Sequence, residues 1–149
     1  MRSSLISFTT LLLFMTNCTD SVEEKALIPT LNMEARLLNA DEKSQLSQIV
    51  LKMQLENYSG DLLKFGISEI EAHQLRLAYY TSQFKKDILL VNGDDTIPCL
   101  DSHFERLHMD LPYRNFILTF GQKMGSQNSK LIIDDHQFSN HLVQVKINQ

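Results

Sequence analysis

The residues best suited to chemistry lie between Cys99 and His108. Cys99, His103 and His108 would supply a thiolate and two imidazoles to zinc or copper, and Asp101 or Glu105 would add a carboxylate oxygen. Because side chains on a strand alternate between its faces, the odd-numbered residues from Cys99 to Glu105, Asp101 included, would share one face. The candidate metal ligands are therefore Cys99, His103, Glu105 and His108. The alternative is an exposed strand face that carries mixed polar residues and no metal.

A thiolate–imidazole nucleophile is a second chemical use of the same segment. It requires Cys99 and His103 within hydrogen-bond reach, and a third group that orients the imidazole. Two residues four apart on a strand are separated by about 13 Å, so this pair would react only on a helix or across a turn. The alternative is that Cys99 is buried as a small apolar residue, as a lone Cys most often is. We therefore predict no catalytic residue.

Two further groups of polar residues have a structural explanation. Residues 134–136, Asp-Asp-His, are typical of a turn rather than of a site. Arg106 and Arg114 flank a turn at Asp110, where they would pair with Glu105 and Asp110 and fix the corner. Binding of an anionic group by these two arginines is the alternative.

Short motifs with a known mechanism are missing from the sequence. It lacks G-x-x-x-x-G-K-[ST], G-x-G-x-x-G, G-x-S-x-G, H-E-x-x-H and C-x-x-C, which mark common phosphate, dinucleotide, hydrolase, metalloprotease and thiol-redox sites. We therefore expect no bound cofactor and favour a non-enzymatic role. An enzymatic or metal-binding domain built on residues 99–108 is the rival hypothesis.

The charge balance argues against a nucleic-acid partner. The chain has 14 Lys and Arg against 18 Asp and Glu, a net charge of −4. Removing residues 1–17 removes only Arg2, which leaves 13 basic and 18 acidic residues, or −5. Phosphate contacts require clustered Lys and Arg, and beyond the first residues the only tight basic pair is Lys85-Lys86.

The first seventeen residues have the pattern of an export signal. Arg2 gives a positive start, and a mostly apolar stretch follows from Leu5 to Met15. Eleven helical residues rise about 16 Å, which is too short for a hydrocarbon core of about 30 Å. A short apolar stretch behind a positive start is typical of a secretory signal peptide.

The next residues resemble the lipobox of bacterial lipoproteins. In Met15-Thr16-Asn17-Cys18 a hydrophobic residue at −3 and a small residue at −2 precede the Cys, while Asn17 departs from the usual Gly or Ala. The resemblance covers residues 1–18 alone. It implies that Cys18 becomes the mature N-terminus and carries a diacylglyceryl group and acyl chains such as palmitate, which hold the protein on a membrane. The alternatives are a cleaved signal without lipid, an uncleaved anchor, and a Cys18–Cys99 disulfide in a secreted protein.

Residues 18–25 are polar and would form a tether, and residues 26–149 would form one domain. Two helices are expected first. The helix from residue 39 to about residue 57 carries an apolar stripe of Leu46, Ile49, Val50 and Met53. A second helix starts at a capping box at residues 68–71 and ends near Lys86.

Strands are expected after the helices, at residues 88–91, 96–100, 115–120, 131–133 and 142–147, with an Asn92-Gly93 hairpin turn after the first. Helices followed by strands indicate an α+β fold, with two N-terminal helices packed on an antiparallel sheet of about four or five strands.

Together these patterns predict a lipoprotein of the cell envelope, periplasmic or surface-facing, with a non-enzymatic binding role. Its partner would be an envelope protein, the peptidoglycan of the cell wall or a small ligand. A further alternative is a carrier that holds a small apolar ligand between the helices and the sheet.

Overall fold

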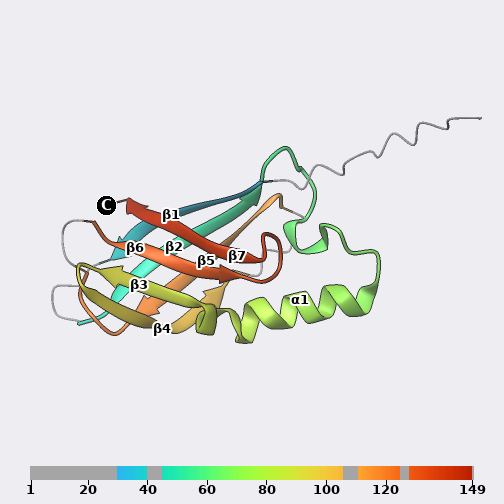
Figure 1. Cartoon of the computed structure of the whole chain (residues 1–149). Helices are drawn as coiled ribbons and strands as arrows, with labels where there is room; N and C mark the ends of the chain where they lie inside the picture. Colours follow the sequence, from blue (N-terminus) through green and yellow to red (C-terminus); the bar gives the residue numbers. More distant parts are fainter. Residues whose placement is uncertain (1–29, 40–44, 106–110, 125–127, 149) are drawn as a thin grey trace, which may run out of the picture.

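The strands of the chain close into a barrel, and an α-helix lies at one end of it (Figure 1). A computed structural model describes residues 30–39, 45–105, 111–124 and 128–148. The strands are β1 (Leu31–Asn39), β2 (Ser47–Leu55), β3 (Ile88–Asn92), β4 (Asp95–Phe104), β5 (Tyr113–Phe120), β6 (Lys130–Asp135) and β7 (His141–Asn148). Around the barrel they follow the order β1-β2-β5-β4-β3-β6-β7.

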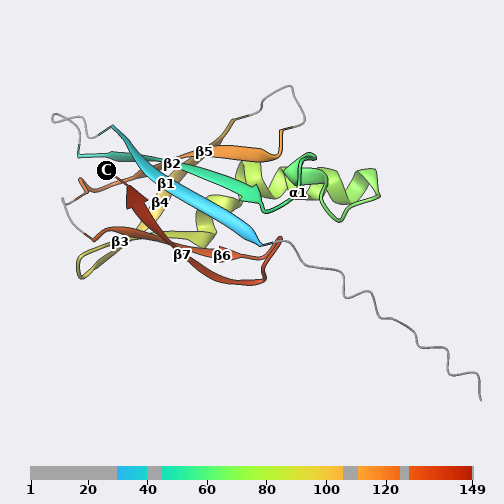
Figure 2. The ribbon, with the colours of Figure 1, turned by 90° about the horizontal axis from the view of Figure 1, so that it is seen from above.

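The seam of the barrel joins β1 to β7 and is its only parallel strand pair among the described residues. The pairing covers Ala35 with Ile147 and Arg36 with Asn148. Figure 2 shows β1 and β7 crossing at an angle. Closure at this seam gives every strand two neighbours, although only two residue pairs join β1 to β7.

The expected α+β fold is wrong, because the first expected helix is strand β2 and the sheet is a closed barrel of seven strands rather than an open one of four or five. The apolar residues of Ser47–Leu55 satisfy the period of a helix and also that of a strand. In the strand, Ile49, Leu51 and Met53 all point inward and are fully buried. A helix would rotate Leu51 about 200° away from Ile49, so the period of two buries more of the run.

The second expected helix is confirmed as α1 (Ile70–Ser82), which a 3-10 turn, η2 (Phe84–Asp87), continues. The capping-box prediction is wrong, because Glu69 is the N-cap and makes no side-chain capping bond. Tyr80 is buried, whereas Ile70 and Leu75 are 76% and 72% exposed. The N-terminal half of α1 extends beyond the barrel end, which leaves its apolar side chains uncovered (Figure 1).

The five strands expected after the helices are confirmed as β3 to β7, with slightly different bounds. The predicted hairpin turn lies between β3 and β4, where Gly93 has a φ of +66°. Glycine adopts this left-handed conformation without the steric cost that a side chain would add.

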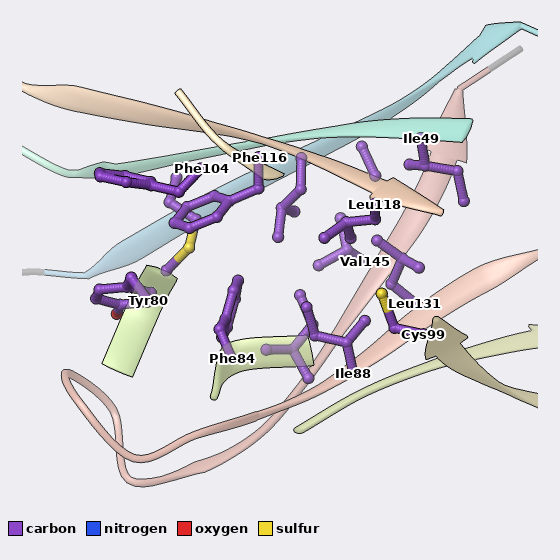
Figure 3. Packing of buried hydrophobic residues seen from close by; sticks show 14 of the residues in the cluster. Ile49, Tyr80, Phe84, Ile88, Cys99, Phe104, Phe116, Leu118, Leu131 and Val145 are labelled. Carbon is purple, nitrogen blue, oxygen red and sulfur yellow. The ribbon is translucent and has the colours of Figure 1, made fainter. Parts of the chain in front are cut away.

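The interior of the barrel is filled by side chains (Figure 3). At the α1 end, the rings of Phe84 and Phe116 have centroids 4.8 Å apart, and Tyr80 lies 5.1 Å from Phe84. Such ring pairs add about 0.5–1.5 kcal/mol each beyond the burial of their area. The carrier hypothesis stays a prediction, but its expected place between two helices and a sheet does not exist, since the first of those helices is strand β2.

Candidate functional site

The outer surfaces of β1, β2 and β5 carry a group of polar side chains, next to which the row of Arg36, Val50 and Ile117 is partly apolar. Strand register places Glu34, Lys52 and Asn115 in one row across the three strands. These side chains point outward because their neighbours along each strand fill the barrel interior. We call this surface the polar face. It consists of Asn32, Glu34, Arg36, Lys52, Gln54, Tyr113 and Asn115.

The polar face is hollowed in two places. A hollow of about 660 Å³ is lined by Glu34, Arg36, Lys52, Tyr113, Asn115 and Asn148, among other residues. A second hollow of about 360 Å³ reaches toward Asn57. Glu34 and Lys52 line both, so the two hollows adjoin each other. Its floor is made of paired strands, which hold side chains more rigidly than loops do.

Several polar groups on this face are available to a ligand. The side chains of Glu34 and Arg36 make no hydrogen bond or ion pair with any residue in the described ranges. The Lys52 ammonium lies 5.1 Å from the centre of the Tyr113 ring, which is a cation–π distance. Both side chains lie on the outer surface of the sheet. Asn115 donates through Nδ2 to Glu105 Oε2 at 3.0 Å, which leaves its carbonyl oxygen to accept.

The structure separates the candidate metal ligands. A bulge between Cys99 and Asp101 breaks the alternation of β4. Cys99 therefore points into the barrel and is 8% exposed, whereas Asp101 and His103 lie exposed on the outside. The expectation that the odd-numbered residues share one face is wrong for Cys99, because the bulge adds a residue to the strand. Glu105 lies beside Asn115 at the border of the polar face.

The chemistry of Cys99 is that of a buried thiol. Its Sγ–H donates to the Asp101 carbonyl oxygen at 3.0 Å, and the Thr119 carbonyl lies 3.7 Å away. Burial raises the pKa of Cys99 to about 11, so the nucleophilic thiolate is scarce at neutral pH. His103 is on the other side of the sheet, so the two residues do not form a nucleophile–base pair.

A metal site on residues 99–108 stays a prediction. His108 lies outside the described residues. Within the described ranges, no group of three or more His, Cys, Asp or Glu side chains is placed to hold a metal ion.

Arg114 has a different partner from the one expected. It forms an ion pair with Asp61, and both side chains are buried. Glu105 instead accepts the hydrogen bond from Asn115. Arg106 and Asp110 lie outside the described residues, so the other half of the expected corner stays a prediction.

The turn expected at residues 134–136 lies slightly later, because Asp134 and Asp135 end strand β6 and the turn between β6 and β7 covers residues 136–139. Asp135 is 2% exposed and accepts hydrogen bonds from the backbone N–H groups of Gln137, Phe138 and Ser139. A carboxylate that accepts several backbone hydrogen bonds shapes a turn and has little capacity left for a ligand. Asp135 therefore stabilises the turn and is not a binding residue.

The export signal, the tether and the lipidation residue Cys18 lie outside the described residues and stay predictions. None of the helices in the described ranges is long and apolar enough to cross a membrane.

Sequence reasoning missed the residues of the polar face. Glu34 and Arg36 lie in a segment for which neither a helix nor a strand was predicted, and Lys52 lies in the expected helix. The alternation of Gln48, Lys52 and Gln54 with buried apolar residues was the signal that could have identified an outward strand face.

No protein-family model matches this chain, and neither the curated proteins nor the solved structures contain a match to it.

Proposed function

We propose that the chain is a non-enzymatic binding protein of the bacterial cell envelope, and that its polar face holds the glycan of the cell wall. The observation that carries the proposal is the row of Glu34, Lys52 and Asn115 along the 660 Å³ hollow. The lipobox-like residues 15–18 support a location in the envelope, where cell-wall glycan is within reach of a tethered domain.

The chemistry of the face suits a polyhydroxylated ligand. Sugar hydroxyls both donate and accept hydrogen bonds, and so do the amides of Asn32, Gln54 and Asn115. Tyr113 offers a partly exposed ring with an apolar face and a polar hydroxyl. Lys52 and Arg36 would pair with the carboxylates that cell-wall glycans and their peptides carry.

Two carboxylates flank the row, Glu34 on β1 and Glu105 beside β5, and three strand spacings separate β1 from β4, or about 14 Å between backbones. The row therefore has acceptors at both ends for hydrogen bonds, with cationic and amide donors between them.

Co-sedimentation of the full chain with purified, insoluble peptidoglycan tests the proposal. We expect the wild type to sediment with the glycan, and the double variant Lys52→Ala with Asn115→Ala to lose at least about tenfold in affinity, since each change removes a polar contact at the centre of the hollow. Gln74→Ala, an exposed change on α1, is the matched control and should bind as the wild type does.

Equal sedimentation of the double variant and the wild type would remove the polar face as the binding site. No sedimentation of the folded wild type would remove the glycan as the ligand.

A further inference from the structure

A groove lies between the end of α1 and the end of β4. The last turn of α1 and the 3-10 turn η2 that follows it pack against β4 (Figure 1). The groove contains a hollow of about 420 Å³, lined by Thr81, Ser102, His103 and Phe104, and a smaller hollow of about 100 Å³. Thr81 and Ser102 line both, so the two hollows adjoin each other. We call the two hollows together the α1–β4 groove.

Ser102 gives the α1–β4 groove an unused hydrogen-bonding group. Its Oγ is buried and has no hydrogen-bond partner among the described residues. A buried hydroxyl without a partner lowers stability, because it has lost its hydrogen bonds to water. The hydroxyls of Thr81 and Ser82 already donate to carbonyl oxygens within α1 and keep only lone pairs for a ligand. Ser102 can therefore donate to a ligand as well as accept from it.

Two opposite charges in the smaller hollow do not neutralise each other. Lys85 of η2 and Asp101 of β4 both line it. Lys85 Nζ donates to the Leu100 carbonyl oxygen at 3.2 Å, and within the described part of the chain neither Lys85 nor Asp101 forms an ion pair. A ligand with one positive and one negative group can therefore find a partner for each.

The surroundings of these charges suit an ammonium and a carboxylate on the same ligand. The C-terminal turn of α1 reaches the smaller hollow through Thr81 and Ser82, and the partial negative charge at this end of a helix favours a cation. Lys85 would hold an anionic group by a charge-assisted hydrogen bond. At roughly 15 Å³ for each water-sized group, the smaller hollow has room for an ammonium, the carbon that carries it and a carboxylate.

We propose that the α1–β4 groove binds an α-amino acid group, in which one carbon atom carries both an ammonium and a carboxylate. Asp101 accepts from the ammonium, Lys85 donates to the carboxylate, and the ligand gives the Ser102 hydroxyl the partner that it lacks. The larger hollow holds the side chain of the ligand beside Phe104. The proposal does not depend on the ligand of the polar face, because the groove shares no residue with that face.

NMR titration of the ¹⁵N-labelled full chain in detergent micelles tests the two-charge recognition. The amide signals of Thr81 and Ser102 report binding of norleucine, which carries both charges, of pentylamine, which lacks the carboxylate, and of hexanoate, which lacks the ammonium. We expect pentylamine and hexanoate to bind at least about tenfold more weakly than norleucine, since each loses a charge-assisted hydrogen bond. Equal binding of the three compounds would overturn the proposal.

Charge-removing variants test the two assigned residues. Asp101→Asn and Lys85→Met should each weaken norleucine binding about tenfold. Asp94→Asn and Lys146→Met are the matched controls, because both residues are exposed elsewhere on the barrel, and they should bind as the wild type does. Norleucine affinity that is unchanged in Asp101→Asn and in Lys85→Met would contradict the assignment.

Ser102→Ala has an expected signature that a purely structural residue would not give. It should weaken norleucine binding and raise the urea midpoint of the free chain, because it removes a hydroxyl that has a partner only when the ligand is bound. A lower urea midpoint, or unchanged binding, would show that the hydroxyl does not serve the ligand.

A further compound separates two sources of the group. In a peptide with blocked termini and one diaminopimelate residue, the side chain ends in a free α-amino acid group. Binding of this peptide as tightly as norleucine would support a cell-wall peptide as the source, and binding of norleucine alone would support a free amino acid. Failure of both compounds to bind the folded wild type would overturn the proposal.

Discussion

Arg114 Nη2 lies 2.5 Å from Asp61 Oδ1, and the two residues are buried although they are 53 positions apart in the chain. The same carboxylate oxygen accepts the backbone N–H of Leu63 at 3.1 Å and so caps the 3-10 turn η1 (Leu62–Lys64). Arg114 also donates to the carbonyl oxygens of Leu111 and Tyr113. One ion pair therefore fixes the segment after β2 to the start of β5.

Replacement of the arginine should be strongly destabilising. Arg114→Met removes one partner and leaves the buried Asp61 carboxylate with a single backbone donor. Breaking a buried pair in this way costs about 3–5 kcal/mol, because the remaining charge is uncompensated. We expect the urea midpoint of the chain to fall accordingly, as followed by circular dichroism.

The matched control for this pair is Asp61→Asn. The amide keeps an oxygen that caps η1 and accepts from Arg114, so the loss should be smaller than in Arg114→Met. A loss in Arg114→Met no greater than about 0.5 kcal/mol, the size typical of a surface substitution, would show that the pair contributes little to the barrel.

Ser47 forms a second long-range connection of this kind, at the other end of β2. Its Oγ–H donates to the Gln122 carbonyl at 2.9 Å and its oxygen accepts the Met124 N–H at 2.8 Å. Ser47→Ala would leave a carbonyl and a buried N–H without these partners, at a cost of about 1–3 kcal/mol. The adjacent outward change Gln48→Ala should leave the urea midpoint nearly unchanged. Equal effects of the two variants would contradict the connection.

The aromatic cluster at the α1 end gives a prediction about packing. Phe84→Ala should cost about 3–5 kcal/mol, because the ring is fully buried between Tyr80 and Phe116 and its loss leaves a cavity. Leu75→Ala on the same helix is the control, since Leu75 is 72% exposed and its truncation removes little packing. Thermal unfolding of the two variants would distinguish them, and a comparable fall in both melting temperatures would argue against the burial of Phe84.

The sequence was sufficient to predict the elements with one clear period or one clear turn. The alternation of apolar and polar residues in β7 and the Asn92-Gly93 turn identify the second half of the barrel, and Tyr80 and Phe84, four residues apart, are typical of one face of a helix. The run from Ser47 to Leu55 was not decidable in this way, because its apolar residues satisfy the periods of a helix and of a strand. Pairing with β1, just before it in the chain, and with β5, much later in the chain, selects the strand.

The candidate site depends on β2, whose secondary structure the sequence alone does not decide. A polar face exists only when β1, β2 and β5 lie side by side, so Glu34, Lys52 and Asn115 carry no signal in common along the sequence. The residues of the metal hypothesis, in contrast, are close in sequence. The bulge after Cys99 nevertheless turns that thiol into the barrel, while His103 stays on the outer face.

The raised pKa of Cys99 predicts a loss of stability at alkaline pH. Burial raises this pKa from 9.0 to about 11, so the folded state holds the thiol proton more tightly than the unfolded state does. The resulting contribution to the free energy of unfolding is complete below pH 9 and disappears as the pH rises from about 9 to about 11. Burial also raises the pKa values of Tyr79 and Tyr80, which extends the loss to higher pH.

Urea unfolding at pH 7 and at pH 10.5 checks this prediction. The wild type should be less stable at the higher pH, and Cys99→Ala should lose less between the two values because it has no thiol to ionise. The rate of alkylation of Cys99 gives an independent readout, since it should still be rising above pH 9 in the folded chain and level off near pH 9 in urea. An alkylation rate that levels off at the same pH in both states would mean that Cys99 is not held in the barrel interior.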